Sequence, residues 1–320
     1  MARILVVAPN WIGDALMAQP LLARLHEKLE GLQLDVLAPE WVAAVLRRMP
    51  EVDDVIAVPF RHGALQLRSR WRLGRELKAR GYRQAIVLPN SWKSALVPFF
   101  ADIPLRSGYV GESRYGLLNL LYKKNGEAMP LHYARLSEPP GKAVKEPLPA
   151  PRLRAAPDAI EAAKRRFGIA GRYAVLCPGA EYGPAKRWPY FPELSASLGM
   201  QAVVLGSPND AEAASGIGGK NLVGRTSLDE AVDLIAGADL VVSNDSGLMH
   251  IAAALGRPQV ALFGSSSPAH TPPLSPAARV LWLRLECSPC FERVCPLGHF
   301  RCMREMTVET VLKEIQNLAA

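Results

Sequence analysis

Several common signatures are missing from this sequence of 320 residues. No stretch approaches the ~18 consecutive apolar residues of a membrane-spanning helix, so we expect a soluble, cytoplasmic chain. No G-x-G-x-x-G motif follows an expected strand and no G-x-x-x-x-G-K-[ST] motif occurs, which disfavours a dinucleotide-dependent reductase and a P-loop nucleotidase. No RNA- or DNA-binding motif is found. Low-complexity sequence is confined to one proline-rich stretch.

The composition indicates a folded chain. Hydrophobic residues make up 49% and charged residues 21%, which is typical of globular rather than disordered proteins. At ~100–200 residues per domain, the length suggests two domains. The apolar run Ile4–Ala8 is interrupted by Pro9 and has no small-residue cleavage pattern after it, so we interpret it as a first strand and not as a signal peptide.

Short apolar runs alternate with amphipathic segments in both halves of the chain. In the first half, we expect strands at Ile4–Ala8, Leu34–Ala38, Val55–Val58 and Ala85–Leu88. We expect helices at Asp14–Leu29, Trp41–Met49 and Leu65–Arg80. In the second half, we expect strands at Tyr173–Cys177, Ala202–Leu205, Leu240–Ser243, Gln259–Phe263 and Val280–Leu283, and helices at Asp158–Phe167, Tyr190–Leu198, Ser227–Ala236, Gly247–Ala254 and Val308–Leu318. Apolar strands separated by helices indicate parallel sheets covered on both faces, so the fold class is α/β, with two doubly wound domains in tandem.

Residues 138–157 interrupt this alternation. They contain Glu138-Pro139-Pro140-Gly141 and prolines at 147, 149, 151 and 157, which cannot build a helix or a central strand. We interpret the stretch as an extended linker, at about 138–157, between a first domain at 1–156 and a second domain at 157–320. The last helix is a candidate to pack back on the first domain. Because doubly wound sheets bind ligands at the carboxyl ends of their strands, we expect the site in the cleft between the domains.

The positive charge is concentrated in the first half. The net charge is +8, and residues 1–150 contribute +7 of it, with 21 Lys and Arg against 14 Asp and Glu. This asymmetry suggests an anionic partner for the first half, such as nucleic acid, a phosphorylated glycolipid or a membrane surface. A solvated basic surface is the alternative.

Three loops that follow expected strands carry candidate site residues. In Pro9–Asp14, Gly13 allows close backbone approach, and Asp14 is either a helix N-cap or a catalytic carboxylate. In Cys177–Pro189, Lys186 and Arg187 precede an expected helix, which indicates a phosphate site or a solvated basic turn. In the third loop, 243–250, Asp245 or Ser246 is expected to cap the next helix, and the main-chain N–H groups there could hold a diphosphate.

Four cysteines lie within 16 residues, at Cys287, Cys290, Cys295 and Cys302. They could bind zinc or an iron–sulfur cluster. Only one C-x2-C pair is present, however, so reduced structural thiols are the favoured interpretation and no metal site is expected. Cys177 is interpreted as a buried strand residue.

Four stretches in order along the chain resemble the lipopolysaccharide heptosyltransferase II family. They are I-L-V-V-A-P-N-W-I-G-D-A-L-M-A-Q-P at 4–20, P-G-A-E-Y-G-P-A-K-R-W-P at 178–189, S-N-D-S-G-L-M-H-I-A-A-A-L at 243–255 and C-S-P-C-F-E-R-V-C-P-L-G-H at 287–299. That family belongs to the ADP-heptose glycosyltransferases, glycosyltransferase family 9. The resemblance implies the GT-B fold, in which two Rossmann-like doubly wound domains face each other across a cleft. It also implies that residues 1–156 form an acceptor-binding domain and residues 157–320 a nucleotide-sugar-binding domain.

The resemblance also implies an activity. The enzyme would transfer L-glycero-D-manno-heptose from ADP-heptose to the first heptose of the lipopolysaccharide inner core, with inversion, and without a cofactor or catalytic metal. The implied partners are ADP-heptose, a phosphorylated Kdo-lipid A acceptor bearing heptose, and the cytoplasmic face of the inner membrane as a peripheral contact, with no nucleic acid. A GT-B-like sugar-nucleotide epimerase and a heptosyltransferase of another core position stay open as alternatives.

Site roles follow from the matching motifs. Asp14 corresponds to the family's proposed general base, and Lys186 to the basic residue held against the donor diphosphate. The further donor-binding residues implied are Gly13, Glu181, Arg187, Thr226, Asp245, Ser246, Gly247, Leu248 and His250. The acceptor-binding residues expected are Asn10, Trp11, Asn90, Trp92 and Lys93, with Arg106, Arg114, Lys123 and Lys124 extending the basic surface.

The chain departs from the first-heptosyltransferase pattern at two places. Ala180-Glu181 stands where those relatives carry small hydroxyl residues, and Gly224-Arg225-Thr226 stands where they carry an acidic residue. These differences favour the second transferase and leave the ribose and adenine contacts open.

Overall fold

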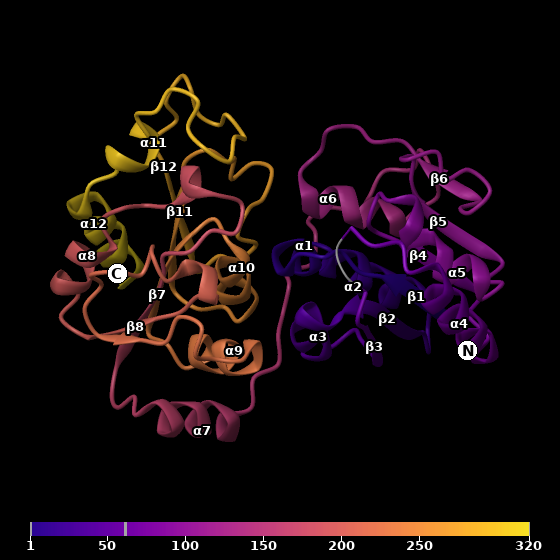
Figure 1. Cartoon of the computed structure of the whole chain (residues 1–320), viewed down its shortest axis with the longest axis horizontal. Helices are drawn as coiled ribbons and strands as arrows, with labels where there is room; N and C mark the ends of the chain where they lie inside the picture. Colours follow the sequence, from indigo (N-terminus) through magenta and orange to yellow (C-terminus); the bar gives the residue numbers. More distant parts are fainter. Residues whose placement is uncertain (1, 61–62, 320) are drawn as a thin grey trace. The chain divides into compact units, whose positions relative to one another are not determined.

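The structure, a computed structural model, describes residues 2–60 and 63–319. It contains two compact units, Met1–Ala150 and Pro151–Ala320, each built on a six-stranded parallel sheet (Figure 1). The predicted α/β class with two doubly wound sheets is confirmed. Among the described residues, no helix combines the length and the apolar character needed to cross a membrane.

The N-terminal unit has the strand order β3-β2-β1-β4-β5-β6. Its elements in chain order are β1 (Arg3–Val7), α1 (Ile12–Met17), α2 (Gln19–Lys28), β2 (Gln33–Pro39), α3 (Glu40–Arg47), β3 (Asp54–Val58), α4 (Leu67–Leu77), the 3-10 turn η1 (Lys78–Arg80), β4 (Gln84–Val87), η2 (Trp92–Ala95), α5 (Leu96–Phe100), β5 (Leu105–Tyr109), β6 (Leu120–Tyr122), α6 (Met129–Ala134) and η3 (Arg135–Ser137).

The side chains of the central strand β1 are buried on both faces of this sheet. Leu5 and Val7 belong to the core cluster that includes Leu77 of α4 and Val97 of α5. Ile4 and Val6 are equally buried, and because successive side chains of a strand point to opposite faces, they serve the other side. Continuous apolar strands are what a sheet covered on both faces requires.

The C-terminal unit has the order β12-β11-β10-β7-β8-β9. Its elements are α7 (Pro157–Phe167), β7 (Tyr173–Cys177), η4 (Pro184–Lys186), α8 (Phe191–Ser197), β8 (Gln201–Val204), η5 (Pro208–Asp210), β9 (Lys220–Asn221), α9 (Leu228–Ala236), β10 (Leu240–Asn244), α10 (Gly247–Ala254), β11 (Gln259–Phe263), β12 (Ala278–Trp282), α11 (Arg301–Arg304) and α12 (Val308–Ala319). Helix α12 packs its apolar residues, such as Val311, into the core of its own unit.

In both sheets, the order in which successive strands are added changes direction beside the first strand of the unit. In the N-terminal unit, the strand order turns between β1 and β4, and in the C-terminal unit it turns between β7 and β10. Ligands of doubly wound folds bind at such switch points, outside the carboxyl ends of the strands. The loops that leave β1 and β4, and those that leave β7 and β10, are therefore where each unit is expected to hold a ligand.

The structure corrects two predictions about the elements. The segment expected as one helix over Asp14–Leu29 is two helices, because the ring of Pro20 would clash with the carbonyl of Leu16 in a continuous helix. Strands β5, β6 and β9 were missed, since their sequences are short or polar. Part of the proline-rich stretch is held against the N-terminal unit, because Arg24 of α2 donates hydrogen bonds to the carbonyls of Lys145 (2.7 Å) and Pro147 (2.6 Å).

Candidate functional site

Asp14 lies in the first turn of α1, just beyond the carboxyl end of β1. The helix begins at Ile12 with Trp11 as its N-cap, so the interpretation of Asp14 as the capping residue is wrong. The partial positive charge of a helix N-terminus favours a carboxylate at this position. The loop therefore holds an anionic side chain at the switch point of the N-terminal sheet.

Tyr133 of α6 contacts this carboxylate, which sequence reasoning did not anticipate. Its hydroxyl donates a hydrogen bond to Asp14 Oδ1 at 3.2 Å. Burial, together with the nearby Asp14, raises the pKa of Tyr133 well above its ordinary value. The phenol is therefore protonated throughout the physiological range and acts as a donor that orients the carboxylate.

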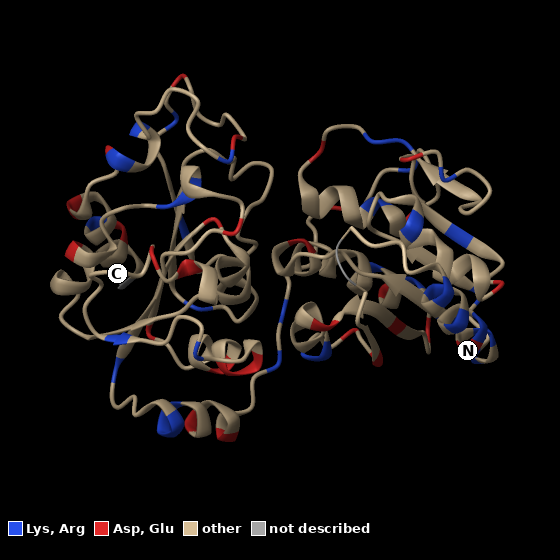
Figure 2. Ribbon diagram, in the orientation of Figure 1, with Lys and Arg blue, Asp and Glu red and all other residues tan. Residues whose placement is uncertain are grey.

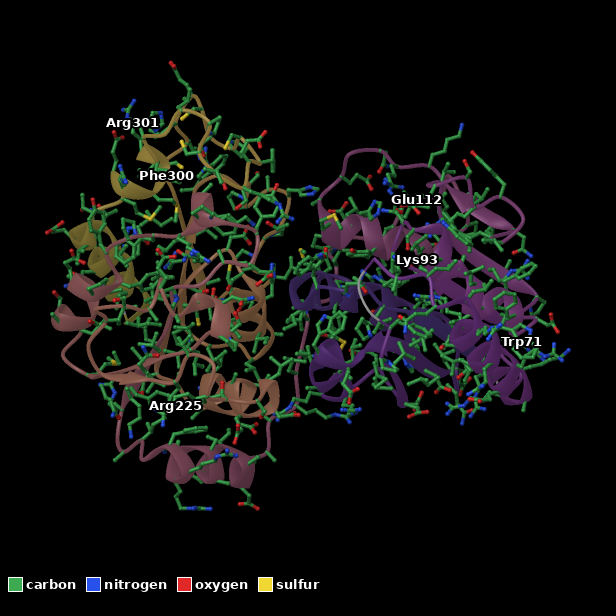
Figure 3. All side chains as sticks on the ribbon, in the orientation of Figure 1. Trp71, Lys93, Glu112, Arg225, Phe300 and Arg301 are labelled. Atoms are coloured by element: carbon green, nitrogen blue, oxygen red, sulfur yellow. The ribbon has the colours of Figure 1, made fainter. Side chains whose placement is uncertain are left out.

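A cavity of about 510 Å³ opens at the same edge of the N-terminal sheet. Four of the predicted acceptor-binding residues, Asn10, Asn90, Trp92 and Lys93, line it, whereas Trp11 is not among the lining residues. Lining residues that the sequence did not single out include Trp41, Phe60, Arg70 and Glu112. Figure 3 labels Lys93 and Glu112, which lie near each other in this view, and the backbone N–H of Trp92 donates to Glu112 Oε2 at 3.0 Å.

Arg114 does not extend the basic surface, as the sequence analysis expected. Its side chain is buried, with a relative exposure of 1%, and its guanidinium donates to the carbonyl of Tyr109 at the end of β5 and to the carbonyls of Pro89 and Ser91 after β4. Lys123 and Lys124 are exposed, in agreement with that expectation. Burial lowers the pKa of Arg114 to about 10, so the group stays charged at neutral pH.

In the C-terminal unit, Lys186 and Asp245 form an ion pair. Lys186 Nζ lies 2.5 Å from Asp245 Oδ2, and the hydroxyl of Ser266 donates to the same oxygen at 2.6 Å. Both charged side chains are largely buried, with exposures of 15% and 5%. Lys186 belongs to η4, and α8 begins only at Phe191. The cation is therefore not in the first turn of α8, and its partner Asp245 lies two positions before α10.

Two further hydrogen bonds join the loops that carry this ion pair. Asn244 Nδ2 donates to the carbonyl of Pro178 at 2.7 Å, and the backbone N–H of Trp188 donates to Asn244 Oδ1 at 3.1 Å. Gly179 is required beside them, because a Cβ there would lie 2.2 Å from the carboxyl carbon of Asp210. The loops after β7 and β10 thus form one fixed structure.

Helix α10 begins next to Asp245 without a side-chain cap. Ser246 is the N-cap residue, but its hydroxyl contacts Ser243 Oγ at 3.1 Å and makes no capping bond. Ser246 thus occupies the predicted N-cap position, but neither its hydroxyl nor the carboxylate of Asp245 makes the capping bond, since both side chains have other partners. Main-chain N–H groups at the start of such a helix are suited to bind phosphate oxygens.

The remaining predicted donor residues differ in their surroundings. His250 is buried inside α10, and burial lowers its pKa to about 4, so its ring is neutral at neutral pH. Arg187 Nη1 lies 3.9 Å from the exposed Glu212. Partly exposed or exposed positions are held by Gly13, Glu181, Thr226, Gly247 and Leu248.

The four C-terminal cysteines and His299 line one small cavity of about 20 Å³. All four thiols are free, as is that of the buried Cys177. Across residues 2–60 and 63–319, no three or more His, Cys, Asp or Glu side chains are arranged to hold a metal ion. Backbone N–H groups at 297–300 lower the pKa of Cys295, whereas burial raises that of Cys302 to about 11.

Comparison with known proteins places the chain among glycosyltransferases. Residues 70–301 match the model of glycosyltransferase family 9 (heptosyltransferase). The chain is 42% identical to lipopolysaccharide heptosyltransferase 2 of Escherichia coli, over 99% of this chain and 98% of the relative. It is also 42% identical to lipooligosaccharide heptosyltransferase 2 of Haemophilus influenzae, over 88% of each. The solved structure of E. coli ADP-heptose lps heptosyltransferase II superposes with a TM-score of 0.88, at 39% identity over 99% of this chain and 98% of that one.

Proposed function

The chain belongs to glycosyltransferase family 9, the heptosyltransferases, and from that membership we propose that it transfers L-glycero-D-manno-heptose from ADP-heptose to the first heptose of the lipopolysaccharide inner core. The observation that carries this is the 42% identity to a heptosyltransferase 2 over 99% of the chain. An epimerase is disfavoured, because relatives of this similarity are transferases.

Asp14 is the proposed general base. As the acceptor hydroxyl oxygen attacks the anomeric carbon of the donor, the carboxylate takes the hydroxyl proton, and the bond between that carbon and the diphosphate oxygen breaks. Attack from the face opposite the leaving ADP inverts the anomeric centre. The support for this role is the position of Asp14 at the switch point, with Tyr133 as its hydrogen-bond donor.

Lys186 and the start of α10 are the proposed diphosphate site. The ammonium would stabilise the charge that grows on ADP as it leaves, and the main-chain N–H groups of Ser246–Leu248 would bind phosphate oxygens. In the present structure the ammonium is paired with Asp245. Donor binding therefore requires Lys186 to exchange a carboxylate for a phosphate, and Asp245 is then available to a donor hydroxyl.

The 510 Å³ cavity of the N-terminal unit is the proposed acceptor site. Its volume lies within the ~300–1,000 Å³ range of small-ligand pockets. Trp41 and Trp92 supply apolar faces for sugar rings, and Asn10 and Asn90 supply hydrogen bonds. We also propose peripheral contact with the membrane face that carries the lipid-linked acceptor, supported by the net charge of +7 in residues 1–150.

The test is mass-spectrometric detection of one added heptose on a truncated core acceptor. ADP-heptose is the donor, and acceptors that end in Kdo or in the first heptose are compared. The proposal expects a product only with the heptose-terminated acceptor. A product on the Kdo-terminated acceptor would indicate another core position, and conversion of the donor without any acceptor would indicate an epimerase.

A further inference from the structure

The acceptor pocket lies beside two buried arginines, and the charge of Glu112 favours the charged form of only one of them, Arg114, against the larger effect of burial. Arg70 of α4 is 7% exposed and Arg114 is 1% exposed. In the part of the chain that the structure describes, neither of them forms an ion pair. Buried charges in proteins are normally paired, so two unpaired guanidinium groups next to one pocket require an explanation.

Arg114 holds one wall of the pocket through neutral oxygen atoms. Its guanidinium donates to Tyr109 O (2.6 Å from Nη2), Pro89 O, Ser91 O (3.4 Å), Ser94 Oγ (3.4 Å) and Asn90 Oδ1 (3.5 Å). Four of these acceptors belong to the segment 89–94, whose residues line the pocket. The side chain therefore fixes the conformation of that segment while it adds a positive charge beneath it.

Glycines on the neighbouring strand and loop make room for this arrangement. A Cβ at Gly108 would lie 2.8 Å from Val87 O and 3.4 Å from Arg114 Nη2. A Cβ at Gly111 would lie 3.1 Å from Asn90 O. The close approach of β5 and the following loop to the segment 89–94 thus depends on residues without side chains.

Arg70 reaches the same segment from α4 and itself lines the pocket. Its Nε donates to Leu65 O at 2.7 Å and its Nη1 to Lys93 O at 3.3 Å, and the guanidinium lies 4.1 Å from the centre of the Phe60 ring. A guanidinium has five N–H donors, so these two bonds leave several donors for a ligand. Among the described residues, Arg70 Nη2 has no hydrogen-bond partner.

The charges around the pocket are unequal in number. Arg70, Arg114 and Lys93 are cationic, whereas Glu112 is the one carboxylate among the described lining residues, and it is exposed. Burial lowers the pKa of Arg70, as it does that of Arg114, because the charged form loses hydration. Figure 2 shows the wider setting, with basic side chains along α4, all of which are arginines.

We propose that Arg70 binds an anionic group of the acceptor glycan, a carboxylate or a phosphate, and that Arg114 is a positioning residue that holds the segment 89–94 for this contact. The planar guanidinium of Arg70 matches two oxygens of such a group at once. The inference rests on the proposed function only in taking the acceptor as the natural ligand. The anion site itself can be tested without the transfer reaction.

The first test measures the binding of small sugars to the full-length protein by saturation-transfer NMR and calorimetry. The probes are Kdo as the carboxylate, mannose 6-phosphate as the phosphate and mannose as the neutral control. Arg70→Gln is compared with Arg68→Gln, which removes the same charge from an exposed position of α4. We expect Arg70→Gln to weaken the preferred anionic probe at least tenfold and Arg68→Gln less than twofold. Equal binding of Kdo, mannose 6-phosphate and mannose, or equal effects of the two variants, would overturn the proposal.

The second test separates positioning from folding in Arg114. Arg114→Lys and Arg114→Met are assayed for acceptor KM, kcat and ADP affinity, with the melting temperature as a folding control. We expect the acceptor KM to rise about tenfold or more in Arg114→Met, with partial rescue in Arg114→Lys and unchanged ADP affinity. A parallel loss of kcat, ADP affinity and melting temperature would show a merely structural role and contradict this part of the proposal.

The two conclusions fail in different ways. If the chain transfers heptose but Arg70→Gln changes neither the acceptor KM nor probe binding, the anion site is wrong and the proposed function stands. If no acceptor is glycosylated but anionic probes still bind in an Arg70-dependent way, the anion site stands and the proposed function is wrong.

Discussion

The two units of this protein hold their site cations in opposite ways. In the N-terminal unit, Arg70 and Arg114 are buried against carbonyls, hydroxyls and an aromatic ring. In the C-terminal unit, Lys186 is paired with Asp245, which also accepts a hydrogen bond from Ser266. An unpaired cation can bind an anion without rearrangement, whereas a paired one must first exchange its partner. The comparison predicts that an anionic acceptor is attracted directly by the unpaired arginine of the N-terminal unit. Donor binding, by contrast, requires Lys186 to exchange the carboxylate of Asp245 for a phosphate.

The largest expected effect separates chemistry from binding. Asp14→Asn removes the base but keeps the shape of the side chain, so kcat should fall by ~10²–10⁴. ADP affinity, measured by calorimetry, should stay within about twofold, because Asp14 belongs to the N-terminal unit. An Asp14→Asn enzyme with normal turnover would show that another group takes the proton.

The next prediction tests the exchange in the donor loop. Lys186→Ala should weaken ADP binding by ~10², and it should also lower stability, because it leaves the carboxylate of Asp245 buried without its cation. Asp245→Asn should tighten ADP binding by about threefold to tenfold, since Lys186 no longer has a partner to give up. Calorimetry of ADP binding to both variants checks these signs. If Asp245→Asn instead weakened ADP binding, the carboxylate would have a direct role in holding the nucleotide.

A third prediction concerns the pH dependence of stability in the C-terminal unit. The pKa of His250 is lowered to about 4 in the folded chain, against an ordinary value near 6.5, because burial disfavours the charged ring. The contribution of the neutral ring to the stability of the folded chain is therefore fully present above about pH 6.5. It is lost as the pH falls toward 4, since the unfolded chain binds the proton more tightly. The slope is at most about 1.4 kcal/mol per pH unit.

Urea unfolding between pH 4.5 and 7.5 checks this prediction. The wild type is compared with His250→Gln, which cannot be protonated in this range. The variant should lose part of the pH dependence, whatever its stability at neutral pH. Identical slopes in the two proteins would mean that His250 is already protonated or exposed when folded.

The smallest expected effect is at Tyr133. Tyr133→Phe removes the hydroxyl that donates to Asp14 while it keeps the buried ring. The value of kcat should fall by about threefold to tenfold, which corresponds to the loss of one hydrogen bond. Tyr109→Phe is the matched control, because the Tyr109 hydroxyl donates to a backbone carbonyl in the same unit. Equal effects of the two substitutions would indicate a loss of packing rather than of orientation.

Much of the fold could be predicted because it depends on local patterns. The apolar runs of β1, β7 and β11 are continuous, and the helix at Gly247–Ala254 was predicted with the bounds that the structure shows. Strand β5 could not be predicted in the same way. Its sequence, Leu-Arg-Ser-Gly-Tyr, has no continuous apolar run, and Gly108 is there because of its neighbours in space.

The sequence predicted which loops carry the candidate site residues, but not the partners of those residues. The loops of Asp14, Lys186 and Asp245 were selected because they follow apolar strands, and the family resemblance supplied the proposed roles. The contact of Tyr133 with Asp14 spans 119 positions and that of Lys186 with Asp245 spans 59, and no local pattern encodes either. Arg70 and Arg114 were not recognised as buried, because an arginine in a sequence is by default a solvated surface residue. Only the tertiary structure distinguishes a buried cation from an exposed one.

The contrast between paired and unpaired cations is tested most directly by a crystal structure of the enzyme with ADP-heptose bound. We predict that Lys186 Nζ contacts a diphosphate oxygen and has moved away from Asp245 Oδ2, while Arg70 and Arg114 keep their contacts with the segment 89–94. A bound diphosphate held elsewhere, with the 2.5 Å ion pair between Lys186 and Asp245 intact, would contradict it.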